Sequence, residues 1–334
     1  MRWGNGIAGA AWLLSLAVSG EGRAAEILKI GWIAVPPSLA PILATKPDLA
    51  TNLGKTYSIE LVRFVGSSAM ITALATHDID IGELAYASFG LAVQNGHMTS
   101  LRIIADLTED GVEGWLSNGF FVLKDGPVKT IEDLKGKTVA TNTIGSGTDI
   151  GIRTMLRRHG LEAKRDYSII ESDYNHMIPL LTEHKADMIT TSSTVAYDPT
   201  LAEVGRVLFH MKDSMGVTQS LVRVSLGDTI AKKRAAMVDY FQDEIRMLRW
   251  FLEPSHHEEV VKIVSTFNKQ SPALLDGWLY THKDGYRDPN LHPNLLAMQG
   301  NLKIQKEAGF LDIDLDVMKF ADLSMVDEAA ARIK

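Results

Sequence analysis

Hydrophobic and polar positions follow one another along the chain in short blocks that predict strands and helices in turn. The first blocks predict a strand, a helix, a strand, a helix and a strand, which is the order typical of a mostly parallel open sheet. The residue ranges of these five elements are Leu28–Ile33, Ser38–Asn52, Tyr57–Phe64, Ser67–Thr76 and Ile79–Gly82. The pattern therefore favours an α/β protein over an all-helical or all-β protein.

The same order of elements recurs further along the chain. The second set of strands and helices covers Thr138–Asn142, Thr148–His159, Tyr167–Glu171, Asn175–Glu183 and Asp187–Thr191. An extended segment, Val217–Ser225, comes next, and three long helical patterns complete the chain: Thr229–Leu252, His256–Asn268 and Pro293–Ala308. Because these helices bring no third sheet with them, we expect them to pack on one of the two α/β units.

The recurrence is visible in individual residues as well as in the order of elements. Met70, Ile71, Leu74, His77 and Asp80 have the spacing of Met177, Ile178, Leu181, His184 and Asp187, with a constant offset of 107 residues. The triplet Tyr57-Ser58-Ile59 returns as Tyr167-Ser168-Ile169. The simplest interpretation is two similar α/β lobes. His77 and His184 fall where their helices end, and we expect both to cap those helices rather than to bind a metal.

The chain must cross between these lobes twice if the helical tail returns to the first one. Crossings near residues 108–120 and 213–224 would form a two-segment hinge beside a cleft. We therefore predict lobe one to be discontinuous, with residues 25–113 and 220–334 and with the helical tail packed on it. Lobe two is predicted to cover residues 114–219.

The first residues have the features of a signal peptide. Arg2 supplies a positive charge, residues 7–18 form an apolar run too short to span a bilayer, and Gly22 and Ala24 are small residues that suit a signal peptidase. We predict that residues 1–24 are removed, although cleavage after Ala25 is an alternative. The mature chain is expected to be a soluble, exported protein.

Composition narrows the functional classes. The 334 residues include no Cys, which excludes disulfide frameworks, thiolate metal sites and cysteine nucleophiles. The net charge of −7, without basic runs, makes nucleic acid and anionic membrane surfaces poor candidates for partners. Gly145-Ser146-Gly147 resembles the start of a dinucleotide fingerprint, but the last glycine of the motif comes one residue late, at Gly151. We expect no cofactor and no metal.

Ligands of open parallel sheets bind beyond the carboxyl ends of the strands, where the next helices begin. Helix starts offer unpaired N–H groups and a positive dipole end, which suit an anion. In most proteins such Ser and Gly residues only cap helices, so the recurrence in both lobes is what favours a binding site. The predicted contacts in these loops are Pro37, Ser38, Gly66, Ser67, Ser68, Ala85, Ser146, Gly147, Thr148, Tyr174, Asn175, Thr191 and Ser192.

Aromatic residues and one carboxylate lie beside these loops. Trp32, Tyr86 and Trp115 are predicted to form the apolar walls of the site, although packing in the core is the usual role of such side chains. Glu83, just past a strand end, either accepts a hydrogen bond from the ligand, acts as an acid or base, or is structural. We expect recognition through backbone N–H groups and hydroxyls, because no Arg or Lys occurs in the four loops at these helix starts, Trp32–Ser38, Gly66–Ser68, Gly145–Thr148 and Asp173–Asn175.

Several segments resemble the nitrate/sulfonate/taurine class of ABC-transporter substrate-binding proteins, the NMT1/THI5-like group. The resemblance is carried by Phe64–Gly82, with its Gly66-Ser67-Ser68 turn, and by Ile131–Val139, with Asp133-Leu134-Lys135-Gly136-Lys137. Lys306–Phe310 and Asp322–Ser324 in the tail are similar too. His77 departs from the Gly that is usual in the group, which affects a turn rather than the site.

The resemblance implies a periplasmic binding protein of the type II fold, in which two α/β lobes close around a ligand. It implies a monomeric periplasmic receptor that delivers a small organic anion to a membrane permease and its ATPase. A sulfonate or an aromatic or aliphatic carboxylate is favoured, with nitrate and taurine within the class. The alternative is an exported or mislocalised, decarboxylase-like enzyme of the same fold that acts on an aromatic acid with Glu83 as acid or base, since one fold can carry several functions.

Overall fold

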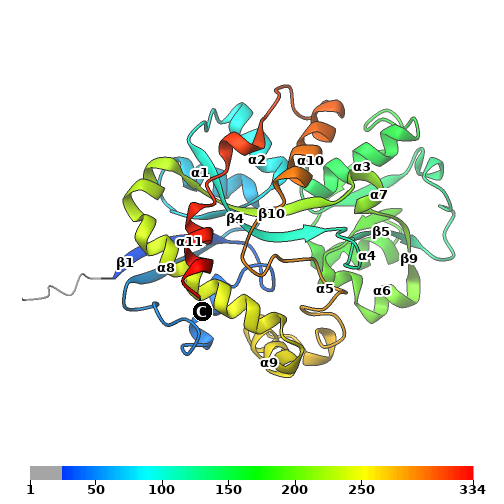
Figure 1. Ribbon diagram of the computed structural model, residues 1–334. Coiled ribbons are helices and arrows are strands. Elements are labelled where there is room, and N and C mark those ends of the chain that lie inside the picture. Colours follow the sequence, from blue (N-terminus) through cyan, green and yellow to red (C-terminus); the bar gives the residue numbers. More distant parts are fainter. Residues whose placement is uncertain (1–24, 334) are drawn as a thin grey trace, which may run out of the picture.

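A computed structural model describes residues 25–333, so the predicted signal peptide lies outside the described residues. The chain forms two α/β lobes with a helical C-terminal region (Figure 1). The predicted fold class is therefore confirmed. Within residues 25–333, no helix combines the length and apolar character needed to cross a membrane.

Lobe one contains two small sheets. In the first, β1 (Glu26–Trp32) pairs in parallel with β2 (Tyr57–Arg63), so that Trp32 lies opposite Arg63 at the carboxyl end. The second sheet has the order β3-β10-β4, and β10 (Thr218–Leu226) is antiparallel to both β3 (Gly82–Ala85) and β4 (Leu101–Asp110). The segments predicted as the first three strands do run parallel, since Ile30 of β1 also forms a parallel bridge with Ile81, whereas β10 adds antiparallel pairing that was not predicted.

Lobe two is built on one five-stranded sheet with the order β7-β6-β8-β5-β9. Its parallel part consists of β6 with β7 and β8, whereas β5 runs antiparallel to β8 and β9. The five strands are β5 (Gly119–Leu123), β6 (Thr138–Thr141), β7 (Ser168–Glu171), β8 (Met188–Thr190) and β9 (Gly205–His210). The three predicted strands of this unit are confirmed, and β5 and β9 extend the sheet on one side.

Each predicted helix forms except the one at residues 38–52. The predicted helix Ser38–Asn52 is wrong, because only a short 3-10 helix, Ala40–Thr45, forms there. Pro41 is tolerated in the first turn, but Pro47 lacks the N–H that a continuing helix needs. The α-helices are α1 (Ser67–Ala75), α2 (Tyr86–Asn95), α3 (Gly147–Arg158), α4 (Met177–Thr182), α5 (Ser193–Ala196), α6 (Pro199–Val204), α7 (Met211–Met215), α8 (Gly227–Leu252), α9 (His257–Asn268), α10 (Leu295–Glu307) and α11 (Ser324–Ala331). Of these helices, α2, α5, α6, α7 and α11 were not predicted. Further 3-10 helices cover Glu132–Leu134, Tyr174–His176, Pro254–His256, Pro272–Leu274 and Val317–Phe320.

The sequence repeat corresponds to a structural repeat. The carboxylate of Asp80 accepts a hydrogen bond from the backbone N–H of Lys29 on β1 at 2.8 Å, and Asp187 accepts one from Thr138 on β6 at 3.0 Å. His77 and His184 both adopt left-handed backbone conformations, with φ of 58° and 56°. Each aspartate thus joins the segment after a helix, α1 or α4, to the start of a strand, β1 or β6, in the same lobe.

Strands β4 and β10 lie side by side in the centre of the molecule and lead toward lobe two (Figure 1). Asp110, at the end of β4, accepts hydrogen bonds from Ser117 Oγ at 2.6 Å and from the Asn118 N–H at 2.7 Å. These bonds hold the first connecting segment against the strand that it leaves. The lobe boundaries at residues 113/114 and 219/220 stay a prediction.

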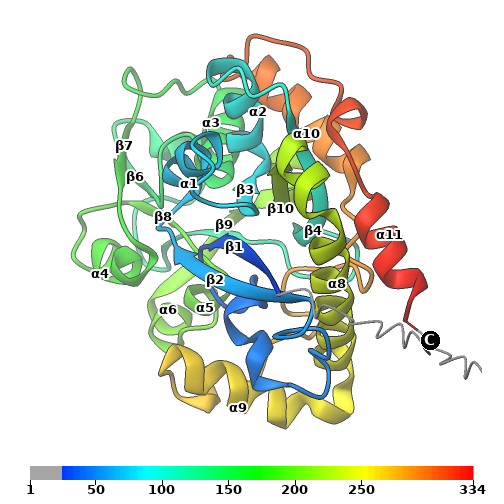
Figure 2. The ribbon, with the colours of Figure 1, turned by 90° about the vertical axis from the view of Figure 1, so that its left-hand side faces the viewer.

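The helical tail returns to lobe one. Helix α8 runs along β1 and β2, with α11 beside it, whereas α10 packs on α2 and β10 (Figure 2). One hydrophobic core continues from lobe one into lobe two, since it contains Leu84 and Phe89 together with Phe120 and Ile150. The two lobes are therefore packed against each other in this structure.

Candidate functional site

The start of α3 carries a cluster of hydroxyl groups at the carboxyl edge of the lobe-two sheet. Asn142 Oδ1 accepts hydrogen bonds from Ser146 Oγ at 3.1 Å and from Thr148 Oγ1 at 2.6 Å. Ser146 is the N-cap of α3 and accepts from the Asp149 N–H at 3.3 Å. The sequence analysis missed Asn142, although its place directly after a strand was the available signal. Ser146 and Thr148 thus lie together, half-buried, with Asn142 fixing their orientation.

A carboxylate in the first turn of α3 is balanced locally. Asp149 is buried, and its side chain accepts from the Gly145 N–H at 2.8 Å and pairs with Arg153 at 2.8 Å. Because this charge already has a cation and a backbone donor, the N–H groups of Gly147 and Thr148 keep their preference for an added anion.

The start of α1 forms the corresponding part of lobe one. Its N-cap, Gly66, supplies no side-chain hydrogen bond to the helix, and Val65 before it is 93% exposed. Ser67 Oγ accepts from the Ala85 N–H at 3.2 Å, which ties the helix start to the end of β3. Ser68 is exposed beside it. The predicted residues Gly66, Ser67, Ser68 and Ala85 therefore lie together.

Tyr86 connects the two helix starts across the lobes. It follows Ala85, and its ring lies against Gly147 so closely that a Cβ on that glycine would be 3.1 Å from the ring. The Tyr86 side chain is fully buried, and its hydroxyl has no hydrogen-bond partner among residues 25–333. Burial, together with the charges of Asp110 and Asp149, raises the pKa of this phenol well above its ordinary value. The structure thus places an unpaired donor beside the start of α3.

Glu83 lies within β3, not past the end of a strand as predicted, and its side chain reaches the loop that follows β1. It is fully buried, and its Oε2 accepts from the Ile33 N–H at 3.2 Å. Burial raises the pKa of Glu83 to about 7, although Arg223 and the neighbouring Ser38 act to lower it. The Ser38 hydroxyl is close enough to have this effect, yet neither it nor Glu83 Oε1 meets the geometry of a hydrogen bond. A direct ligand contact of Glu83 stays a prediction.

The predicted tryptophan walls contact other parts of the protein. Trp32 is half-buried, with its ring centroid 5.9 Å from that of Phe267 in α9 and with the Arg63 guanidinium 5.7 Å above it. Arg63, which the sequence analysis did not select, forms no ion pair with residues 25–333 and is a cation at the edge of the site. Its position as the last residue of β2 was the available signal.

Trp115 packs against a loop of the C-terminal region. Its ring centroid lies 4.5 Å from that of His282 and 5.2 Å from that of Tyr286. This loop also reaches lobe two, because Lys283 O accepts from Tyr197 Oη at 2.7 Å. Nothing in the sequence pattern indicated that residues 278–287 would lie beside the site. For Trp32 and Trp115 alike, contact with a ligand stays a prediction.

The remaining predicted residues are spread along the same edges. Tyr174 is half-buried, and burial raises its pKa to about 12 while its neighbour Thr148 acts to lower it. Asn175 is exposed, whereas Thr191 is buried and donates to Gly119 O at 3.0 Å, which is a structural bond within lobe two. Ser192 and Pro37 are half-buried, and Ser192 begins the short helix α5.

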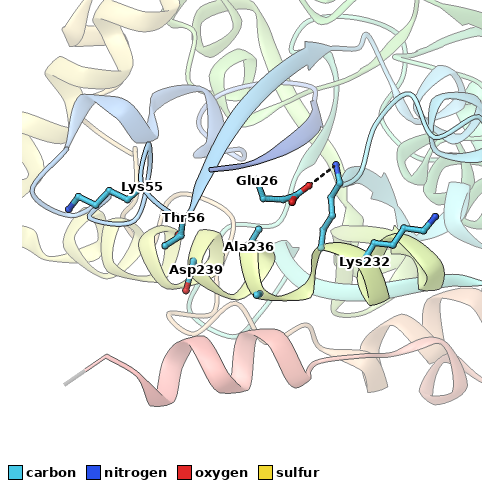
Figure 3. A pocket seen from close by; sticks show the side chains of 8 residues that line it. Glu26, Lys55, Thr56, Lys232, Ala236 and Asp239 are labelled. Atoms are coloured by element: carbon cyan, nitrogen blue, oxygen red, sulfur yellow. Dashed lines mark ion pairs between the residues drawn. The ribbon is translucent and has the colours of Figure 1, made fainter. Parts of the chain in front are cut away.

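A surface hollow of about 230 Å³ lies elsewhere, at the amino ends of β1 and β2 beside α8 (Figure 3). Lys55, Lys232 and Asp239 line it, and Glu26 pairs with Lys233 at 4.0 Å. None of the predicted binding residues lines this hollow. No group of three His, Asp or Glu side chains suited to a metal ion occurs among residues 25–333.

Comparisons with solved structures show what the fold resembles. The alkanesulfonate-binding protein SsuA from Xanthomonas axonopodis pv. citri, bound to MOPS, has a TM-score of 0.70 and 17% identity, over 90% of this chain and 100% of that one. The periplasmic nitrate-binding protein NrtA from Synechocystis PCC 6803 has a TM-score of 0.70 and 16% identity, over 93% and 89%. The desulfurization enzyme DSZB has a TM-score of 0.65 and 12% identity, over 92% and 100%.

The match to a family model adds what these distant structures do not. Residues 58–241, more than half of the chain, match the model described as NMT1/THI5 like. The matched range includes the start of α1, Tyr86 and the start of α3. The chain therefore belongs to the NMT1/THI5-like family, and its two lobes have the fold of the periplasmic binding proteins.

Proposed function

We propose that this protein is the solute-binding receptor of an ABC importer. It would capture a small organic anion, a sulfonate or an aromatic or aliphatic carboxylate, between the lobes and deliver it to a permease in the inner membrane. The family supports a binding role, since relatives of the same fold are named for binding alkanesulfonate and nitrate. In this proposal, lobe one consists of residues 25–113 and 220–334, and lobe two of residues 114–219.

The observation that carries the proposal is the unpaired hydroxyl of Tyr86 beside the start of α3. A buried hydroxyl without a partner costs about 1 to 3 kcal/mol, so a ligand that accepts its hydrogen bond gains that amount. The same ligand group would meet the N–H groups of Gly147 and Thr148. An acid group has the several acceptor oxygens that this arrangement can fill.

The test measures thermal unfolding of the purified mature chain with MOPS, methanesulfonate, taurine, benzoate or nitrate. A receptor should be stabilised by one of the organic anions, by about 4 kcal/mol at a thousandfold excess over the Kd, and the compound should be recovered unchanged. Native mass spectrometry of the protein as purified would detect a ligand outside this panel. Absence of stabilisation by every compound, with no co-purified molecule, would overturn the proposal.

Export is part of the proposal. Residues 1–24 would direct the chain to the periplasm, where such a receptor meets its permease. Fractionation of cells that produce the full-length chain should place the mature protein in the periplasmic fraction, and deletion of residues 2–24 should retain it in the cytoplasm. Retention of the full-length chain in the cytoplasm would contradict the proposal.

The exported enzyme is the competing function, and DSZB has a similar fold. We propose that Glu83 is not a catalytic acid or base here, because its carboxylate is buried and faces the Ile33 N–H and Arg223. Incubation of the protein with aromatic carboxylates, followed by mass spectrometry, separates the two functions. Turnover of any of these acids would favour the enzyme.

A further inference from the structure

Glu83 is in register with a buried arginine in the sheet below the candidate site. In the antiparallel pair of β3 and β10, Glu83 lies directly opposite Arg223, and both side chains are buried. Arg223 also forms an ion pair with Glu244 of α8 and donates to the Asp106 carbonyl of β4 at 3.2 Å. The guanidinium thus connects β4 and α8, and it faces the carboxylate of Glu83 on β3 without forming an ion pair with it.

The other side of Glu83 faces the loop that follows β1. Its Oε2 accepts from the Ile33 N–H at 3.2 Å, and the Ser38 hydroxyl lies next to the same carboxyl group. Ile33 comes directly after Trp32, and Ser38 precedes the 3-10 helix Ala40–Thr45. The carboxylate therefore contacts the loop at its first residue and lies beside its last.

The charges around Glu83 leave its own charge sensitive to pH. Arg223 on β10 is the cation that faces it, while Glu244 on α8 adds a second negative charge and Ser38 contributes a hydroxyl. Tyr240 on α8 lies beside Glu244 and Arg223. Arg223 is ion-paired with Glu244 and not with Glu83, so the buried charge of Glu83 is only partly balanced, and such a charge is costly. Burial raises the pKa of Glu83 to about 7, so its protonation changes near neutral pH.

We propose that Glu83 is a positioning residue: its carboxylate, buried opposite Arg223, accepts from the Ile33 N–H, fixes the loop Ile33–Ser38 and thereby shapes the lobe-one half of the ligand site. This inference rests on the proposed function for the meaning of that site, but the loop contact itself does not need a ligand. An ionised carboxylate accepts a stronger hydrogen bond than a protonated one. The Ile33 N–H should therefore be held more firmly once Glu83 loses its proton.

The experiment is amide hydrogen exchange by NMR on the ligand-free mature protein between pH 6 and 8. After correction for intrinsic exchange, protection of the Ile33 amide should rise by about fivefold with pH in the wild type, from the difference between charged and neutral hydrogen bonds. Glu83→Gln should give a flat profile. Glu60→Gln, an exposed change on β2, is the matched control and should retain the rise. An unchanged rise in Glu83→Gln would overturn the proposal.

A second variant keeps the test decisive if Glu83→Gln does not fold. Ser38→Ala removes a hydroxyl that lowers the pKa of Glu83, so the midpoint of the Ile33 profile should move to higher pH. A midpoint that stays in place would count against Glu83 as the titrating group. Because both measurements use protein without ligand, they can fail while the receptor proposal holds, and the converse is also possible.

Discussion

The Tyr86 hydroxyl gives the sharpest test of the candidate site, because its removal should act in opposite directions on stability and on binding. In the ligand-free protein, the phenol is buried and its hydroxyl has no partner among residues 25–333. Tyr86→Phe keeps the ring against Gly147 and removes only the hydroxyl. Relief of an unsatisfied buried group should stabilise the protein by about 1 to 3 kcal/mol.

The same change should weaken the binding of an organic anion. A hydrogen bond to a charged group contributes about 1.5 to 3 kcal/mol, which corresponds to roughly a ten- to hundredfold loss of affinity. Thermal unfolding without ligand gives the first quantity, and calorimetric titration with the compound that stabilises the wild type gives the second. For a chain of this size, the melting temperature should rise by roughly 2 to 5 °C.

Tyr57→Phe is the matched control for this substitution. Tyr57 is also fully buried, but its hydroxyl donates to Asp243 Oδ2 at 2.9 Å, and it lies at the amino end of β2, away from the site. Removal of that hydroxyl should lower the melting temperature and leave the affinity unchanged. If Tyr86→Phe lowers the melting temperature as this control does, or binds the anion as tightly as the wild type, our assignment of the hydroxyl is wrong.

Three further predictions follow from the contacts of the lobes. Gly147→Ala should push the ring of Tyr86 and α3 apart and reduce ligand affinity by about tenfold or more, measured by titration, with a larger radius of gyration in solution scattering. Asp80→Ala and Asp187→Ala should each lower the free energy of unfolding by about 1 to 3 kcal/mol in denaturant titrations, and a loss in only one lobe would contradict their equivalence. The pKa of Glu83 is about 7 in the folded protein and ordinarily 4.5, so between these pH values the folded protein keeps a proton that the unfolded chain has lost. The free energy of unfolding should therefore fall as the pH rises from 5 to 7, by up to about 1.4 kcal/mol per pH unit. Glu83→Gln should flatten that fall.

The elements that the sequence predicted correctly are those whose hydrophobic pattern depends only on which face of the element is buried. Helices α1, α3, α8, α9 and α10 bury one face, so their periodicity is readable without the partner. The 107-residue offset was informative because Asp80 and Asp187 make the same backbone contact in both lobes. The same aspartate-to-backbone hydrogen bond is needed in both lobes, and the residues that form it therefore recur in the sequence.

The elements that the pattern missed depend on distant partners. Strand β4, at the edge of its sheet, carries the buried acids Asp106, Glu109 and Asp110, which interrupt the apolar run that marks buried strands. Asp106 is accommodated there by Gln219, which donates to it at 2.6 Å from more than a hundred residues away. Because the local sequence around Asp106 does not reveal this partner, it does not predict the strand either.

The candidate site was predicted in part for the same reason. Ser146 and Thr148 follow a strand and begin a helix, so local sequence indicates where they lie. The contact of Tyr86 with Gly147 joins two lobes, and the contact of Trp115 with His282 joins the hinge to the tail, so neither follows from spacing along the chain. Sequence therefore identified the edges of the site, whereas the contacts across it required the fold.

The closed packing of the lobes has a consequence for how a ligand would enter. Tyr86 is fully buried against Gly147, and a single hydrophobic core continues through both lobes, so an anion can reach the phenol only after the lobes separate. Separation exposes apolar surface and breaks the bond from Tyr197 to Lys283 O, which costs free energy before any ligand contact forms. The measured affinity would then equal the intrinsic affinity reduced by the population of the open form. Substitutions that weaken the lobe contact away from the site should therefore speed ligand association, whereas Tyr86→Phe should act mainly on ligand release.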